Sequence, residues 1–353
     1  MAALERVGSS GWYVLGQEVE SFEASFAQWV SQPHAIGCAS GLDAISLALL
    51  ALGIEPGDKV LTTPLSAFAT TLAILHAGGV PVFVDVDESG LLDLEQAERC
   101  LRDHGDIHFM VPVHLFGHAI DLDRLESLAG QYAVKIVEDA AQAVGARSGE
   151  LPVGSVGQAT AFSFYPTKNL GALGDGGCVV TANTSTGRLI RSLRDYGQSA
   201  KYVHEHIGLN SRLDELHAAV LRSAYLPLLS GWNQRRSVIA SRYLASLDHY
   251  LVRPAVVPDN SSSVWHLFPV LVAEQKRDAL LAYLRNAGVQ AAVHYPTAIP
   301  DQPALSRSGK QVVATPPVNA RRFAAEEVSL PIHPYLLDRE VERVIALINE
   351  WQP

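Results

Sequence analysis

The stretch HAIGCASGLDAISLALLAL, residues 34 to 52, decides the fold class. Its first part is an apolar run of strand length, and its second part is a helical pattern that is apolar nearly all round. A strand that is apolar along its whole length is buried on both faces, and a following helix supplies the crossover to a parallel neighbour. The same order of strand and helix recurs in residues 59–78, 80–105 and 107–132, and further strands are expected at 134–139, 159–166 and 177–183. The sequence therefore predicts an α/β domain with a mostly parallel, doubly wound sheet.

The pattern changes after about residue 230. The later segments predict helices at 232–247, 276–288 and 338–352 and strands at 265–272 and 289–295. We therefore expect a large α/β domain over residues 1–230, with the N-terminal segment, and a small C-terminal α+β domain over residues 231–353. Two stretches without periodicity, residues 256–263 and 306–317, are interpreted as surface loops.

Composition narrows the class of protein. The chain has 353 residues, 48% of them hydrophobic, so it can bury a large core. Its formal net charge of −10 argues against binding to nucleic acid or to a membrane surface. No signal peptide or membrane span is expected, which favours a cytoplasmic location. Cys38, Cys100 and Cys178 form no CxxC pair and are expected to be small core residues.

Polar residues that follow buried strands are the candidates for chemistry, since ligands of open α/β sheets bind beyond the carboxyl ends of the strands. Ser40, Gly41 and Leu42 begin a helix after a strand, where free backbone N–H groups attract a phosphate; Ser40 as a simple helix cap is the alternative. Asp139 ends the strand in VKIVEDAAQAVGA, and Gln142 follows three residues later. A helix cap is again the alternative for Asp139, unless its carboxylate faces a cation.

One lysine stands in an unusual setting. In FSFYPTKNLGALGDGG, residues 162 to 177, Ser163 lies on a strand and Lys168 lies between an aromatic run and a glycine-rich turn. The other five lysines are in polar turns, at a strand edge or in polar surroundings. In IGLNSRLDELHAAVL, a capping pattern accounts for Ser211 and Asp214 but leaves Asn210 without an explanation.

These groups together match the needs of pyridoxal 5′-phosphate. The cofactor requires a lysine amine for a Schiff base, a carboxylate beside the pyridine nitrogen and an anchor for its phosphate. Desolvation lowers the pKa of a lysine and so increases the share of free amine. The sequence therefore predicts a pyridoxal-phosphate enzyme.

The chain resembles the sugar aminotransferases of the DegT/DnrJ/EryC1/StrS family, which have fold type I of the pyridoxal-phosphate-dependent transferases. The resemblance runs along nearly the whole chain, through SGLDAISLAL, PVFVDVD, PVHLFG, VEDAAQAVGA, FSFYPTKNLGALGDGGCVVT, NSRLDELHAAVL, VHYP and VSLPIHP. It implies that Lys168 forms the Schiff base, that Asp139 pairs with the ring nitrogen, that Gln142 bonds the phenolic oxygen and that Phe68 stacks on the ring.

The resemblance also assigns the phosphate and the partners. Ser163 and the backbone at Gly41 and Leu42, beside Ser40, would hold the phosphate. Asn210 would reach the phosphate in the neighbouring subunit of a homodimer with shared active sites. The amino group would pass from L-glutamate to a keto sugar linked to a nucleoside diphosphate. Many relatives have threonine at the position of Leu42, and leucine there favours dTDP-linked 3-keto-6-deoxy sugars over 4-keto sugars.

Some interpretations stay open. His266, His294 and Tyr295 lie where the small domain would close over the sugar, and for each of them a core position and a substrate contact are both open. A pyridoxamine-phosphate-dependent sugar dehydratase is a second hypothesis, although such relatives have histidine at the position of Lys168. A non-catalytic sensor is a third, although no basic stripe or DNA-binding helix pair supports it. No metal site is expected.

Overall fold

A sheet of eight strands forms the centre of the computed structural model, which describes residues 1–352. Only β9 runs against its neighbours, and the pairs from β8 to β15 are parallel. The mostly parallel sheet expected from the sequence is thus confirmed. Its strands, in spatial order, are β1 (His34–Cys38), β9 (Gly177–Thr181), β8 (Ala159–Ser163), β5 (Lys135–Asp139), β4 (Ile107–Val111), β2 (Lys59–Thr62), β3 (Val80–Phe83) and β15 (Val312–Val313).

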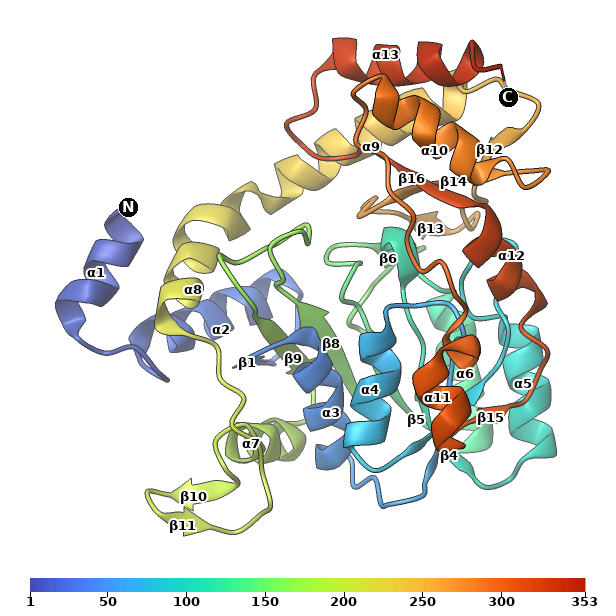
Figure 1. Ribbon diagram of the computed structural model, residues 1–353. Helices are drawn as coiled ribbons and strands as arrows, with labels where there is room; N and C mark the ends of the chain where they lie inside the picture. Colours follow the sequence, from blue (N-terminus) through green and yellow to red (C-terminus); the bar gives the residue numbers. More distant parts are fainter. Residues whose placement is uncertain (353) are drawn as a thin grey trace.

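Helices cover both faces of this sheet (Figure 1). Successive strand residues point to opposite faces, so Val60 and Leu61 lie in two different apolar clusters. One face packs against α3 (Gly41–Ala51), α4 (Phe68–His76) and α7 (Thr184–Leu193). The other packs against α2 (Gln17–Trp29), α5 (Leu94–Asp103) and α6 (Leu122–Tyr132). Burial on both faces explains why the strands are apolar throughout.

A second apolar core, formed by residues from Ile239 to Trp351, lies above the large sheet in Figure 1. It is built on an antiparallel sheet in the order β12 (Val252–Pro254), β14 (Phe268–Val272) and β16 (Glu327–Leu330). The helices are α9 (Leu229–Ser246), α10 (Arg277–Asn286) and α13 (Asp338–Asn349). The division of the chain at residues 230 and 231 stays a prediction, and Ala320 and Phe323 pack in the core of the large sheet.

Both stretches interpreted as surface loops contain short elements. Residues 306–317 include the end of α11 (Pro303–Ser308) and all of β15, which adds to the edge of the large sheet beside β3. Val312 pairs with Val82 there. Val312 and Val313 are both β-branched, which favours a strand. Residues 256–263 include β13 (Ser261–Ser262), which pairs with β6 (Arg147–Ser148).

The prediction of a strand at residues 289–295 is wrong. A single bridge, between Ala292 and Ser329, joins this segment to β16. Tyr295 has a φ of +60°, a left-handed conformation that ends any extended run. The segment instead turns toward the carboxyl edge of the large sheet. In contrast, the three cysteines are buried and unpaired, as expected.

One irregular helical stretch connects the two cores. It passes from α8 (Glu215–Val220) through a π-helical turn, η2 (Leu221–Tyr225), and a 3-10 turn, η3 (Leu226–Leu228), into α9. Glu215 is buried, and its carboxylate accepts hydrogen bonds of 2.9 Å from the backbone N–H groups of Gly16, Glu18 and Val19. It thereby caps the first turn of α2 from a distant part of the chain.

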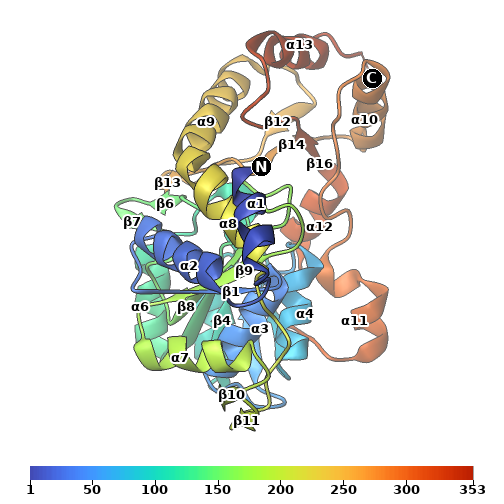
Figure 2. The same cartoon turned by 90° about the vertical axis from the view of Figure 1, so that its left-hand side faces the viewer.

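The remaining elements lie around these two cores. A hairpin projects from the bottom of the molecule in Figures 1 and 2 and carries the exposed side chains of Tyr202 and Val203. These elements are α1 (Ala2–Ser10), η1 (Leu115–Gly117), β7 (Leu151–Pro152), β10 (Gln198–Ala200), β11 (Val203–His204), η4 (Ile299–Asp301) and α12 (Val318–Glu326).

Candidate active site

The candidate site lies at the carboxyl ends of β1, β5 and β8, which run in the same direction. After β1 the chain enters α3 at Ser40, whose hydroxyl accepts the N–H of Asp43 at 3.1 Å. A Cβ atom added to Gly41 would lie 2.7 Å from the Cβ of Ser163, at the end of β8. The glycine therefore allows the start of α3 and the end of β8 to approach each other closely.

This approach leaves donors without acceptors. The N–H groups of Gly41 and Leu42 have no acceptor within residues 1–352, as expected for the first turn of a helix. The Ser163 hydroxyl accepts the N–H of Tyr165 at 3.3 Å, and its own proton has no acceptor in the same range. Two backbone donors, one hydroxyl and the positive end of the α3 dipole together fit an anion such as a phosphate. Ser40 is a helix cap, and its hydroxyl is engaged by Asp43.

Asp139 is buried at the end of β5, with 4% of its surface exposed. Its Oδ2 accepts the hydroxyl proton of Thr70 at 2.7 Å, and its Oδ1 accepts the N–H of Ala141 at 3.0 Å. Ser66 lies 2.9 Å from the Thr70 hydroxyl, so a chain of two hydroxyl groups ends on the carboxylate. Within residues 1–352 no cation forms an ion pair with Asp139, which leaves it available for a protonated ring nitrogen.

Lys168 lies in the turn after β8, and its backbone N–H bonds the carbonyl of Tyr165 at 2.8 Å. Burial lowers the pKa of Lys168 from 10.5 to about 8, and the negative charge of Asp139 opposes this decrease. A lysine with this pKa has a substantial fraction of neutral amine near neutral pH. It is therefore suited to attack a carbonyl group.

Gln142 and Tyr295 join the large sheet to the segment before η4. The side-chain oxygen of Gln142 accepts the N–H of Phe116 at 2.7 Å, and its amide donates to the Tyr295 hydroxyl at 2.7 Å. One proton of that amide remains for another acceptor. Phe68 begins α4 and packs beside Phe83 at the carboxyl end of β3.

A cavity of about 680 Å³ opens beside Lys168. His266 and His294 both line it. Burial lowers the pKa of each imidazole, and the charge of Lys168 adds to the effect. His266 is bonded through Nδ1 to the side-chain oxygen of Asn169 at 3.2 Å. Both histidines are therefore neutral, and both are placed to meet a molecule bound in the cavity.

Asn210 does not lie in this cavity. It is exposed and lines a separate groove with Ala39, Asp175 and Arg212, and it forms a bridge with Asp195. The structure thus places Asn210 near the start of α3, in a groove that includes Ala39, but outside the cavity beside Lys168. Its predicted role toward a neighbouring subunit stays a prediction.

Four further residues of the site were not predicted. Thr70 contacts Asp139, although in the sequence it is one of several threonines in an apolar helix. Arg236 lines the cavity, is bonded to the carbonyls of Trp265 (3.0 Å), His266 (3.3 Å) and Ile332 (2.7 Å), and has its pKa lowered by burial to about 10. Trp232 and Tyr335 form an aromatic pair on the rim. The arginine pair in WNQRRSV was the signal in the sequence for Arg236.

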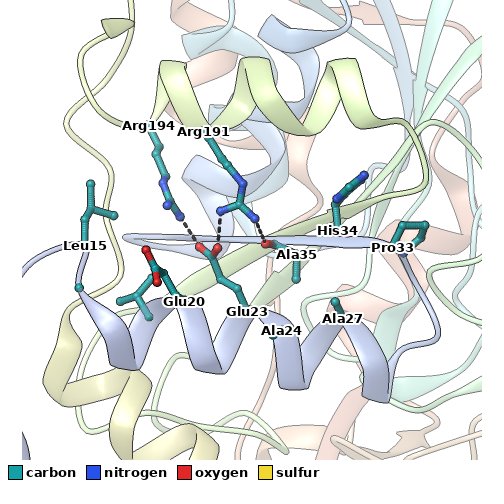
Figure 3. Close-up of a pocket in the computed structure, with 12 residues that line it drawn as sticks. Leu15, Glu20, Glu23, Ala24, Ala27, Pro33, His34, Ala35, Arg191 and Arg194 are labelled. Atoms are coloured by element: carbon teal, nitrogen blue, oxygen red, sulfur yellow. Dashed lines mark hydrogen bonds and ion pairs between the residues drawn. The ribbon is translucent and has the colours of Figure 1, made fainter. Parts of the chain in front are cut away.

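A second pocket, of about 540 Å³, lies between α2 and α7 (Figure 3). Glu23 points at Arg191 and Arg194 there and forms ion pairs with both. Glu23 also accepts the N–H of Gly37 at 2.8 Å, so these charges fasten β1 to its flanking helices. The pocket contains none of the predicted site residues. Its ion pairs join Glu23 to both arginines, whereas Glu20 on its wall forms no ion pair within residues 1–352.

The residues present fit pyridoxal phosphate. They supply an amine of lowered pKa, a buried carboxylate without a cation and free donors at a helix start, which are the three groups the cofactor requires. Within residues 1–352 no group of three or more metal-ligating side chains could hold a metal ion. Over the same part of the chain, the helices are too short or too polar to cross a membrane.

Comparison with known proteins adds a family to this geometry. The model of the DegT/DnrJ/EryC1/StrS aminotransferase family matches residues 1–349. A dTDP-3-amino-3,4,6-trideoxy-alpha-D-glucose transaminase of Streptomyces venezuelae is 42% identical, over 99% of this chain and 91% of the relative. The erythromycin biosynthesis sensory transduction protein EryC1 of Saccharopolyspora erythraea is 44% identical, over 98% of this chain and 93% of its own.

A solved structure is similar over the same length. The crystal structure of S. venezuelae DesV in complex with a ketimine intermediate superimposes with a TM-score of 0.93 and 42% identity. The match covers 99% of this chain and 93% of that chain. The fold expected from the sequence is therefore confirmed along nearly its whole length.

Proposed function

Because this chain belongs to the DegT/DnrJ/EryC1/StrS aminotransferase family, we propose that it is a pyridoxal-phosphate-dependent aminotransferase of nucleotide-linked sugars. The amino donor is L-glutamate, and the acceptor is a dTDP-linked 3-keto-6-deoxy sugar. The observation that carries this proposal is Lys168, an amine with a pKa of about 8 that faces the charge of Asp139 beside a cavity of about 680 Å³.

Each residue has a role that its contacts support. The cofactor, when bound, acts as an electron sink that lets an amino group leave one carbon and join another. Lys168 would hold the cofactor through its side-chain amine, with loss of water, and the amine, once released, would carry protons. Asp139, oriented by Thr70, keeps the ring nitrogen protonated. Ser163 and the first N–H groups of α3 anchor the phosphate. Gln142 would donate its remaining amide proton to the phenolic oxygen, and Phe68, at the start of α4, would stack on the ring, as the family resemblance implies.

The substrate class is supported by the relatives and by Leu42. The S. venezuelae relative is named for a dTDP-linked 3-amino sugar. The family resemblance associates leucine at the position of Leu42 with keto groups at carbon 3. The sugar dehydratase hypothesis is disfavoured because Lys168 is present. EryC1 is named as a sensory transduction protein, but a sensor would have no use for the set formed by Lys168, Asp139 and Gln142.

The proposal is tested by a panel assay. Purified protein is incubated with pyridoxal phosphate, L-glutamate and dTDP- or UDP-linked sugars that carry a 3-keto or a 4-keto group, and 2-oxoglutarate is measured. We expect product with the dTDP-linked 3-keto sugar. Lys168→Arg should abolish it, whereas Lys201→Arg, a change at an exposed lysine, should not. Borohydride reduction should leave the cofactor on Lys168. A label on another lysine would overturn the assignment.

We further propose a homodimer with shared sites, in which Asn210 contacts the phosphate bound by the second copy. Asn210 is exposed in a groove beside Ala39, where a second copy could reach it, and this supports the proposal. Lys168→Ala and Asn210→Asp should each be inactive, because the second variant sets a negative charge against the phosphate. Refolded together, they form one intact site per heterodimer and should regain activity. Heterodimers without any gain would refute the shared site. The cytoplasmic location stays a prediction.

A further inference from the structure

A buried carboxylate behind the cavity has no function in the proposed reaction so far. Glu327 begins β16, is 1% exposed and forms no ion pair within residues 1–352. Its Oε2 accepts the backbone N–H of His294 at 2.7 Å, and its Oε1 accepts the hydroxyl proton of Ser329. The Ser329 oxygen lies 2.8 Å from Nδ1 of His294. Three side chains thus form a chain of hydrogen bonds that ends at the cavity wall.

While Glu327 is ionised, the proton count along this chain of hydrogen bonds fixes the tautomer of His294. Ser329 has a single hydroxyl proton, which it donates to Glu327. Its oxygen can then only accept from His294, so Nδ1 carries a proton. Burial and the charge of Lys168 lower the pKa of His294, which keeps the ring neutral. A neutral imidazole has one proton, so Nε2 carries a free lone pair.

This lone pair has no partner among residues 1–352, and His294 lines the cavity with Lys168 and His266. We propose that Glu327 and Ser329 are positioning residues that hold His294 as a hydrogen-bond acceptor for a hydroxyl group of the bound sugar. The identity of the sugar as ligand rests on the proposed function. The tautomer does not, since it follows from the contacts of this chain and the ionised state of Glu327.

The substitution Glu327→Gln reverses the chain of hydrogen bonds without changing its size. The N–H of His294 requires an acceptor, so the glutamine oxygen faces it and the amide faces Ser329. Ser329 must then accept from the amide and donate to Nδ1. His294 responds by carrying its proton on Nε2. Ser329→Ala breaks the chain instead, and Glu326→Gln, at the neighbouring glutamate, is the matched control.

Nitrogen-15 correlation spectra of labelled histidine report the tautomer directly, and His294→Ala assigns the signals. At roughly pH 8.5, above the pKa of Glu327 that burial raises to about 7, the apoprotein should show a protonated Nδ1 and a bare Nε2. Glu327→Gln should exchange the two, and the control should not. A wild-type His294 protonated on Nε2, or an unchanged tautomer in Glu327→Gln, would overturn the proposal.

A pH titration of the same spectra provides an independent check. Protonated Glu327 resembles glutamine as a donor, so lowering the pH through about 7 should convert the wild-type tautomer and leave that of Glu327→Gln unchanged. The charged or titratable groups that face Glu327 are Arg277 of α10, whose charge lowers the pKa of Glu327, and His294 and Tyr295 of the preceding segment. If the tautomer of His294 in the wild-type protein does not respond to pH across this range, the proposed chain of hydrogen bonds is contradicted.

The sugar contact is tested with dTDP-glucose and dTDP as probes, by calorimetry. His294→Ala and Glu327→Gln should each weaken dTDP-glucose binding, by about tenfold for the first and about threefold for the second, and leave dTDP binding unchanged. The double variant should equal His294→Ala, because Glu327 acts through His294. Additive losses, or equal losses with dTDP, would refute the positioning role. If the wild-type protein binds neither probe, the nucleotide class of the proposed function fails, and the spectra still decide the tautomer.

Discussion

We expect the pKa of Lys168 to set how fast the apoprotein captures pyridoxal phosphate, the cofactor proposed above. With a pKa of about 8, Lys168 is neutral in about one tenth of the molecules at pH 7, whereas an ordinary lysine with a pKa of 10.5 is neutral in about one in 3000. At equal intrinsic reactivity, Lys168 should therefore react about 300 times faster at pH 7 than an exposed lysine. Above pH 8 the advantage should shrink, because most of the amine is then neutral.

Asp139→Asn provides the perturbation. The charge of Asp139 raises the pKa of Lys168 against the effect of burial, so the neutral amide should lower that pKa below about 8. The rate of pyridoxal phosphate capture, followed by stopped-flow absorbance from pH 6 to 10, should level off near pH 8 in the wild type and at a lower pH in the variant. Asp301→Asn, at a surface ion pair with Arg321, is the control. A wild-type rate that still climbs tenfold per unit above pH 9, or a profile that moves to higher pH in Asp139→Asn, would refute this reasoning.

Three other substitutions probe separate contacts. Lys168→Met should stabilise the apoprotein at pH 7, because the decrease in the pKa of Lys168 from 10.5 to about 8 corresponds to about 3 kcal/mol of unfavourable burial below pH 8. This penalty disappears as the pH rises from 8 to 10.5. Urea titrations at pH 7 and 10 measure the stabilisation, and equal effects at both would contradict the explanation. Thr70→Val should lower kcat about tenfold, since Asp139 loses a hydrogen bond, while Thr70→Ser restores it; circular dichroism confirms the fold, and full activity in Thr70→Val would exclude an orienting role. Glu215→Gln should lower the free energy of unfolding by about 2 kcal/mol, because an amide cannot accept all three N–H groups at the start of α2, and an unchanged melting temperature would argue against the cap.

The large sheet was predictable because its strands are buried on both faces, as Val60 and Leu61 show. The edge strand β15 was not, since two valines in a polar stretch give no periodicity to read. Residues 289–295 gave the opposite error, since the sequence predicted a strand that the structure does not contain. Their β-branched and aromatic residues favour a strand, but the left-handed turn at Tyr295 depends on the position of the segment against the large sheet.

The residues of the candidate site likewise include some that the sequence indicated and some that it did not. Lys168 and Asp139 stood out as candidates because a lysine beside an aromatic run and a carboxylate at a strand end are unfavourable unless they find a partner, although a helix cap was the alternative for Asp139. Thr70 and Glu327 gave no such signal. The partner of Thr70 is 69 residues away, and His294 is 33 residues from Glu327, so only the folded chain reveals their purpose. The role of Asn210 depends on a second copy and stays a prediction.

The helical connection from α8 to α9 has a mechanical consequence. The 18 residues of α9 form a rod about 27 Å long, anchored at one end by the π-helical and 3-10 turns of η2 and η3. A rotation of about 5° at that anchor moves the far end by about 2 Å. The rod carries Trp232 and Arg236, which line the cavity, within its first two turns, near the pivot. A rotation of this kind would move the end of α9 that lies in the second apolar core much farther than it would move Trp232 and Arg236.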